Sequence, residues 1–326
     1  MDGCNEKREA PALRFIAKHR AIALLLLILL MCLAFGLAMP STFGTYDNFA
    51  LILLNMSSEA TVLIAIALVL IMGEIDLSLG ANMVLGGIIT GRLMIVAGMN
   101  MWLAMAIALL IAMVCGAING FIVAKLGVAA FIATLGTSMI YLGVAILLAG
   151  TGWTDFPDET FKALGQTRLA GLQMPVFYMV VLLVIFAVLV ARTRYFRQIY
   201  YIGGNATAAD LSGIDIVKTK IAMYMIATTL SCLGGIFAAM RFNSALPSVG
   251  AGVELRAVTA CVIGGVSFTG GTGTIGGAAM GALFVAVLNN LLTSIGVSPN
   301  VQYCITGVVL ILAIVLDITL SKKQKA

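Results

Sequence analysis

The sequence predicts an all-α polytopic membrane protein with about ten transmembrane helices and an inverted internal repeat. Three observations support this. Hydrophobic residues make up 61% of the 326 residues and charged residues only 10%, whereas soluble chains carry about 25% charge. The apolar residues gather in runs of about 20, the length of a bilayer-spanning helix. A pattern of an acidic residue, a leucine and a glycine pair occurs twice.

We expect the spans near residues 21–39, 49–72, 78–98, 101–123, 129–150, 174–191, 220–240, 254–270, 275–294 and 302–319. An even number of spans puts both termini on one side. With both in the cytoplasm, most of the lysines and arginines lie on that side, as the positive-inside rule requires. The chain therefore divides into a basic cytoplasmic tail at 1–20, a single membrane domain at 21–320 and a cytoplasmic tail at 321–326.

The repeat pairs Asp76-Leu77 and the following 84–88 stretch, VLGGI, with Glu254-Leu255 and 262–266, VIGGV, at a constant offset of 178 residues. The first copy opens the third span and the second opens the eighth, so the two helices cross in opposite senses. Inverted halves at about 45–150 and 215–320 are typical of transporters. On this prediction Asp76 and Glu254 lie at opposite faces of the membrane.

Five residues of the repeat are expected to shape helix turns. They are Asp76, Gly80, Glu254, Gly264 and Gly265. Asp76 follows an apolar span and precedes another, so its carboxylate is suited to N-cap the third span.

Polar residues inside the apolar runs are candidates for a solute pathway. Asn55, Ser58 and Glu59 interrupt the second span, and an ionisable group at membrane depth is costly enough to indicate a cavity or a broken helix. Glu59 at the outer interface of the membrane is an equally good interpretation. Asn119 and Asn289 occupy related places in the two halves, where interhelical hydrogen bonding is the alternative to solute contact.

Two polar segments lie outside the expected spans. The cytoplasmic segment 192–219 contains Thr207-Ala208-Ala209-Asp210, which predicts a capping box and a short helix that ends at Gly213. The opposite side carries residues 153–175 with several acidic and aromatic side chains. Each segment is either a docking surface or an ordinary connection.

Enzymatic and nucleic-acid functions receive no support. The single histidine lies in the N-terminal tail, the six cysteines are scattered, and the net charge is +5. The string 271–276 matches GxGxxG but separates two spans, so we expect a tight loop there without a nucleotide. No P-loop motif for ATP is present. We predict no catalytic site, metal or cofactor, and no nucleic-acid partner.

Three stretches resemble the permease subunits of ABC importers of the ribose, xylose, galactose and autoinducer class, within the branched-chain-amino-acid-type permease superfamily. They are GEIDLSLGA at 73–81, YYIGGNATAADLSGIDIVKTK at 200–220 and VELRAVTACVIGGVSFTGGTGTIGGAAMGAL at 253–283. The resemblance covers nearly the whole chain from about residue 45. Glu74 stands where many relatives have a second glycine.

The resemblance implies a permease in the bacterial inner membrane. It would pair with a second copy of itself or a homologous permease, with a cytoplasmic ATP-binding subunit that hydrolyses ATP, and with a periplasmic sugar-binding protein. It implies that seven residues couple the permease to the ATPase: Gly203, Gly204, Asn205, Ala208, Ala209, Asp210 and Gly213. An ion-coupled secondary transporter of a small polar solute is the alternative function. The identity of the sugar stays open.

Overall fold

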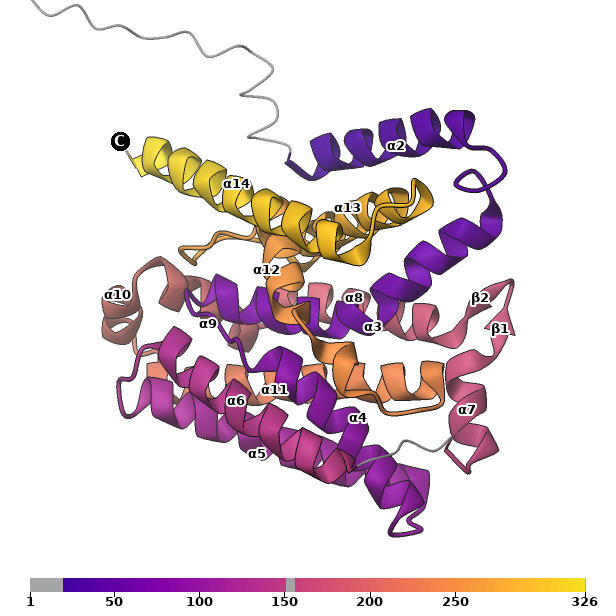
Figure 1. Cartoon of the computed structure of the whole chain (residues 1–326). Helices are drawn as coiled ribbons and strands as arrows, with labels where there is room; N and C mark the ends of the chain where they lie inside the picture. The colour runs from indigo at the N-terminus through magenta and orange to yellow at the C-terminus, as the bar shows by residue number, and fades with distance from the viewer. Residues whose placement is uncertain (1–19, 151–155, 326) are drawn as a thin grey trace, which may run out of the picture.

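The protein is described by a computed structural model that covers residues 20–150 and 156–325. The described chain is almost entirely helical (Figure 1). The N-terminal part contains α2 (Arg20–Ala38), α3 (Tyr46–Ile71), α4 (Leu79–Ile95), α5 (Met101–Ala124), α6 (Ala130–Ala149), α7 (Glu159–Gln166), β1 (Arg168–Leu169) and β2 (Leu172–Gln173). The C-terminal part contains α8 (Met174–Arg192), α9 (Arg194–Gly204), α10 (Ala206–Leu211), α11 (Ile216–Phe242), η1 (Pro247–Gly250), α12 (Val253–Ile263), α13 (Ile275–Ser294) and α14 (Pro299–Lys325).

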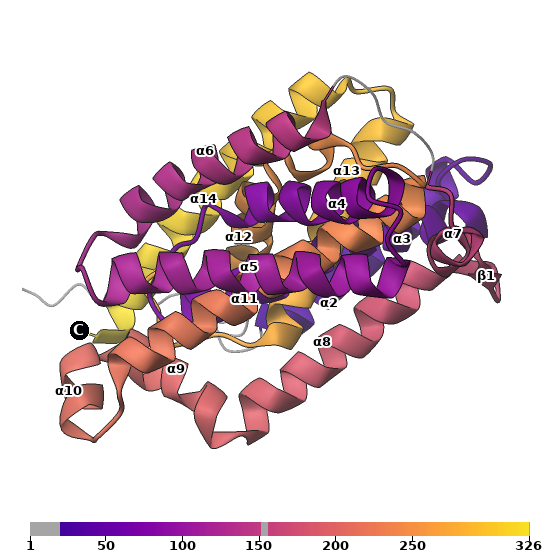
Figure 2. The ribbon, with the colours of Figure 1, turned by 90° about the horizontal axis from the view of Figure 1, so that it is seen from below.

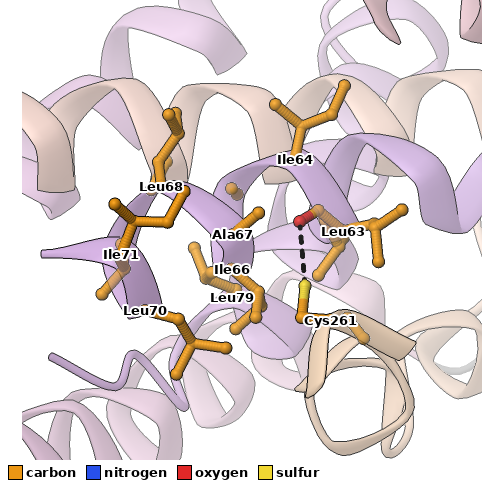
Figure 3. Packing of buried hydrophobic residues seen from close by; sticks show 14 of the residues in the cluster. Leu63, Ile64, Ile66, Ala67, Leu68, Leu70, Ile71, Leu79 and Cys261 are labelled. Carbon is orange, nitrogen blue, oxygen red and sulfur yellow. Dashed lines mark hydrogen bonds between the residues drawn. The ribbon is translucent and has the colours of Figure 1, made fainter. Parts of the chain in front are cut away.

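The core is built around α3. Every residue from Ala60 to Met72 is buried, and a helix that is apolar on all sides is suited only to the centre of a bundle. Figure 3 shows the side chains of this stretch packed around the helix, with the Sγ of Cys261 on α12 donating to the carbonyl oxygen of Leu63 at 3.7 Å. This apolar stretch of α3 thus forms the centre of the molecule.

The long helices α3 and α11 pack against each other in opposite directions. At one end Arg241 of α11 donates to the carbonyl oxygen of Leu54 at 3.2 Å. At the other end Lys220 pairs with Glu74, just beyond the end of α3. Between these ends, the backbone of Gly234 lies against Thr61 of α3. These contacts fix the antiparallel direction.

The two helices begin corresponding four-helix sets, α3–α6 and α11–α14. In each set a long helix is followed by a shorter helix and two further helices. The sets interlock, because α11 packs against α4 and α5 while α3 packs against α12 and α13. Figure 2 shows α5 and α11 side by side. Since α3 and α5 are each antiparallel to α11, and α13 is antiparallel to α3, the arrangement agrees with the predicted inverted repeat.

Six described helices are long and apolar enough to cross a membrane: α3, α5, α6, α8, α11 and α13. The remaining predicted spans also contain helices, but the prediction of a full span at 254–270 is wrong. Helix α12 has 11 residues, about 16 Å at 1.5 Å per residue, roughly half of the ~30 Å hydrocarbon core. It ends because Gly265 has a φ of +88°, a conformation that stops an α-helix.

The non-spanning elements lie at opposite ends of the bundle (Figure 1). Helices α9 and α10 occupy one end, and the C-terminal end of α14 lies on the same side. Helix α7 and the antiparallel hairpin of β1 and β2 occupy the other end. Asp158 caps α7 by accepting the backbone N–H of Thr160 at 2.8 Å. The basic tail at 1–20 lies outside the described residues apart from Arg20, and the predicted C-terminal tail continues α14 to Lys325.

Candidate functional site: a polar cavity and a glycine junction

A polar cavity of about 270 Å³ lies between α3, α12, α13 and the start of α14. Three of the predicted pathway residues, Asn55, Glu59 and Asn289, line it together. Asn55 and Glu59 are four residues apart on α3 and therefore share one face of that helix. Asn289 comes from α13, which belongs to the other half of the repeat. The fold thus brings polar residues from both halves to one place.

Arg256 of α12 was not among the predicted pathway residues, yet it lines the same cavity. Its Nη2 donates to Oε1 of Glu59 at 2.7 Å and its Nε to Oε2 at 3.4 Å. The Arg256 side chain is 18% exposed and that of Glu59 40% exposed. The predicted span at 254–270 begins two residues before Arg256, so the sequence places this arginine at the outer end of a span. One feature of the sequence could have indicated Arg256. A carboxylate such as that of Glu59 at membrane depth requires a cation nearby.

The other two predicted pathway residues lie elsewhere. Ser58 is buried where α3 packs against Gly234 of α11. Asn119 is buried on α5, where its Nδ2 donates to the Oγ of Ser78 at 2.8 Å and its Oδ1 accepts the hydroxyl of Tyr141 at 3.2 Å. Neither lines the polar cavity. Asn119 therefore matches the alternative of interhelical hydrogen bonding.

The start of α4 corrects two predictions. The N-cap of α4 is Ser78, not Asp76; Asp76 lies two residues earlier and accepts the backbone N–H and the hydroxyl of Ser78 at 2.8 and 2.6 Å. Gly80 is helical, and a Cβ atom there would overlap the carboxylate of Glu254. Gly80, four residues after Asp76, thus lies beside Glu254, so the two copies of the repeat pattern meet and do not lie at opposite faces.

The second glycine pair of the repeat ends a helix. Gly264 is the C-cap of α12, and the N–H of Val266 bonds the carbonyl oxygen of Cys261 at 2.9 Å. This bond closes the last turn in the manner of a Schellman motif. The predicted turn at Gly264 and Gly265 is therefore present, and it starts the loop that leads to α13.

The segment 192–219 forms two short helices joined at Asn205. The predicted capping box at Thr207 is wrong, because Asn205 is the N-cap of α10 and accepts the N–H of Ala208 at 3.0 Å. Asn205 precedes the helix directly, so its side chain reaches the free first-turn N–H groups. The predicted end is correct, with Gly213 at a φ of +83° after Ser212.

Helix α9 was not predicted. Its buried residues Phe196, Ile199 and Ile202 recur every three positions, the spacing of an amphipathic helix. This face holds α9 against the core, whereas Leu211 at the tip of α10 is 86% exposed. Beyond α10, the backbone N–H of Lys218 donates to Asp215 at 3.0 Å, and this bond lowers the pKa of the Asp215 carboxyl.

The end of α9 meets both halves of the repeat at a junction of glycine backbones. A Cβ atom on Gly203 would overlap the carbonyl oxygen of Ile71 and lie 2.6 Å from the nitrogen of Gly271. The N–H of Gly271 donates to that carbonyl oxygen at 2.8 Å. Gly270, at a φ of +84°, would place a Cβ atom 2.7 Å from the Cα of Gly73. Only glycine permits this approach.

The glycine junction, comprising Ile71 and Gly73, Gly203 and Gly204, and Gly270 and Gly271, joins the three sequence stretches that carry the resemblance. Tyr200 adds a further link, since its hydroxyl donates to the carbonyl oxygen of Gly273 at 2.8 Å. The GxGxxG string is accordingly a tight loop between α12 and α13, not the strand–helix turn of a dinucleotide site. Its glycines serve backbone packing.

Comparison with known proteins identifies the family. A model of the branched-chain amino acid transport system permease component matches residues 48–314. This chain belongs to that permease family. It is 36% identical over 304 residues to the ribose import permease protein RbsC of Escherichia coli (strain K12), covering 92% of this chain and 93% of the relative. No solved structure matches.

Two further relatives cover most of the chain. The L-arabinose transport system permease protein AraH of Escherichia coli is 33% identical over 284 residues, 87% of this permease and 85% of the relative. The galactose/methyl galactoside import permease protein MglC of Haemophilus influenzae is 34% identical over 329 residues, 95% and 97% of the two chains. This permease is thus a membrane component of an ABC importer, and ATP hydrolysis lies in a separate subunit.

Proposed function

We propose that this permease forms the passage for a neutral monosaccharide in an ATP-driven importer, and that the polar cavity between α3, α12 and α13 is part of this passage. The relatives are permeases named for ribose, L-arabinose and galactose. The observation that carries the proposal is the polar cavity inside an apolar bundle, lined by Asn55, Glu59 and Asn289. Polar side chains at membrane depth are costly and mark solute pathways.

The cavity also favours this function over ion-coupled transport. A coupled carrier needs an ionisable group that binds and releases the coupling ion. Among the described residues that line the cavity, the one carboxylate is that of Glu59, and it is already neutralised by Arg256 at 2.7 Å. Energy supplied from outside the membrane domain is consistent with such a site.

The coupling surface for the ATP-binding subunit is proposed to be α10 with the end of α9. Asn205, Ala208, Asp210 and Gly213 are exposed there, and Leu211 offers an apolar side chain outside the spanning helices. In this contact the ATP-binding subunit would cover the Leu211 side chain, as apolar side chains at the centre of an interface are covered. Ala209 is buried and Gly203 packs against Ile71, so movement of α10 passes directly to the glycine junction.

Both termini and α10 would face the cytoplasm of a bacterial cell, whereas α7 and the β1–β2 hairpin would face the periplasmic sugar-binding protein. A second copy of the chain, or a homologous permease, would cover part of the apolar exterior. That exterior is extensive on α6, where Phe131, Ile132, Met139 and Leu147 are exposed.

The test is uptake by the complete transporter. The permease is reconstituted in liposomes with its ATP-binding subunit and binding protein, and labelled ribose, L-arabinose and galactose are offered with and without ATP. We expect ATP-dependent uptake of a neutral sugar that ionophores leave unchanged. Uptake driven by an ion gradient without nucleotide would contradict the proposal.

A pair of variants tests the coupling surface. Leu211→Ser is expected to abolish binding of the ATP-binding subunit, because it removes the exposed apolar side chain from the contact. Leu169→Ser is the matched control, since Leu169 is an exposed leucine on the hairpin at the opposite end. Copurification of the two subunits is the measurement. Equal copurification for both variants would contradict the assignment of α10.

A further inference from the structure

We propose that the polar cavity is a recognition subsite for a neutral polyhydroxylated solute, and that Arg256, clamped by Glu59, contacts the hydroxyl groups of that solute. This inference rests on the proposed function. It goes further because it assigns selectivity to the permease itself, and to Arg256, which was not among the predicted pathway residues.

The charge of the cavity selects an uncharged solute. Among the described residues that line it, only Glu59 and Arg256 are charged, and they pair with each other. Arg241, outside the lining, donates to Oδ1 of Asn55 at 2.7 Å. An acidic or basic solute would have to displace one partner and leave the other charge uncompensated, which is strongly unfavourable in a partly buried site. A neutral solute can bind while the ion pair stays closed.

The hydrogen-bonding groups of the cavity are arranged for hydroxyls. Arg256 uses three of its five donors, on Glu59 and on the carbonyl oxygen of Ala251. The Glu59 carboxylate retains acceptor capacity, since it accepts two of about four bonds. Among the described residues, the Asn289 side chain makes no hydrogen bond. A hydroxyl both donates and accepts, so a polyol can satisfy all of these groups at once.

The remaining lining provides room and an apolar surface. Alanines occur at five lining positions, and these are Ala60, Ala257, Ala260, Ala282 and Ala286. Their small side chains leave a volume of about 270 Å³, equivalent to roughly nine water molecules at about 30 Å³ each. This volume is on the scale of a monosaccharide, and the alanine methyl groups can contact its C–H faces. The cavity thus combines a polar rim with an apolar wall, as small-molecule sites do.

A purely structural role is the competing interpretation. The Glu59–Arg256 pair joins α3 of the first half to α12 of the second, so its loss could act through misfolding alone. Two variants separate these roles. Arg256→Lys keeps the charge but loses the planar fork that donates to several partners. The exchanged pair Glu59→Arg with Arg256→Glu restores the ion pair and reverses the groups presented to the solute.

The experiment compares these variants with the unaltered permease in the reconstituted, complete transporter. Arg92→Lys is the matched control, because Arg92 is an exposed arginine outside the polar cavity. For each protein the thermal midpoint, the ATPase rate of the assembled complex, and KM and kcat of neutral-sugar uptake are measured.

We expect Arg256→Lys to raise KM about tenfold, the effect of losing one charge-assisted hydrogen bond. Its thermal midpoint should stay close to that of the unaltered protein, because the substituted side chain keeps a positive charge opposite Glu59. The exchanged pair should recover the thermal midpoint but not the uptake, and Arg92→Lys should match the unaltered protein. Normal KM in Arg256→Lys, or full uptake in the exchanged pair, would overturn the subsite. No ATP-dependent sugar uptake by the unaltered transporter would instead reject the proposed function.

Discussion

The two halves of the repeat contain cavities between corresponding helices, and these cavities differ in chemistry. In the first half, α4, α5 and α6 enclose about 570 Å³ lined by aliphatic side chains, with Arg92 and Tyr141 among the few polar ones. In the second half, α12, α13 and α14 together with α3 enclose about 270 Å³ lined by amides and the Glu59–Arg256 pair. The two halves share an order of helices, yet the cavity is polar in one half and apolar in the other.

The duplicated glycine pair shows the same divergence. Gly86 and Gly87 lie inside α4, where Gly86 packs against Cys232 and Gly87 against Gly235 of α11. Gly264 and Gly265 end α12. In the first copy the absent side chains permit helix packing, whereas in the second the positive φ of Gly265 stops the helix. Identical residues at the same spacing thus do not guarantee the same local structure.

The largest effect is expected where α9 meets both halves. Gly203→Ala forces a methyl group onto the carbonyl oxygen of Ile71, and backbone atoms cannot move aside. We expect a loss of about 3 kcal/mol, the upper part of the usual range for overpacking, and no sugar uptake. Gly204→Ala is the control, because a Cβ atom there meets nothing within 4 Å. Thermal unfolding and uptake measure both, and equal midpoints would disprove the close junction.

The ion pair between Lys220 and Glu74 also joins the halves. Both side chains are largely buried, at 18% and 16% exposure, so Glu74→Ala leaves a lysine without its partner. We expect a loss of about 1.5–3 kcal/mol in unfolding free energy. Lys218→Ala removes the pair with Asp215, whose lysine is 86% exposed, and should change little. Denaturant unfolding measures the free energy of both variants. A similar loss of unfolding free energy in the two would show that burial does not make the Lys220–Glu74 pair more important than the Lys218–Asp215 pair.

Asn119 and Asn289 test whether the two halves of the repeat differ in function. Asn119→Ala leaves the hydroxyl of Ser78 without one of its partners and should cost about 1–2 kcal/mol of stability. Asn289→Ala should leave stability unchanged but lower uptake, since its amide faces the cavity without a hydrogen bond to a described residue. Thermal midpoints and uptake rates are measured for both. If Asn119→Ala lowered uptake and Asn289→Ala lowered stability instead, the solute would bind in the first half.

The smallest effect is expected in the apolar cavity. Arg92 is exposed and donates to the carbonyl oxygen of Leu148 at 3.0 Å. Arg92→Gln should change the free energy of unfolding by no more than about 0.5 kcal/mol, as is usual for surface positions, and should leave uptake intact. A large loss of uptake in this variant would show that both cavities take part in transport.

The sequence by itself determined the helical class, the position of the six long apolar helices and the opposite direction of the two halves. Apolar runs and duplicated motifs are local properties of the chain, and the thickness of the bilayer converts a run of about 20 apolar residues into a span. The stretch at 254–270 misled this reasoning, because the loop that follows α12 carries no charged residue, although Gly264 and Gly265 end the helix.

Only the tertiary structure decided which polar residues meet. The sequence left Arg256 out of the candidate pathway residues, and it included Asn119 on the same grounds as Asn289. The packing of α12 against α3 places Arg256 opposite Glu59, and the packing of α5 places Asn119 beside Ser78 and Tyr141. A side chain's partner depends on which helix faces it across the bundle. That pairing joins residues separated by 197 positions for Arg256 and Glu59, and no local pattern encodes it.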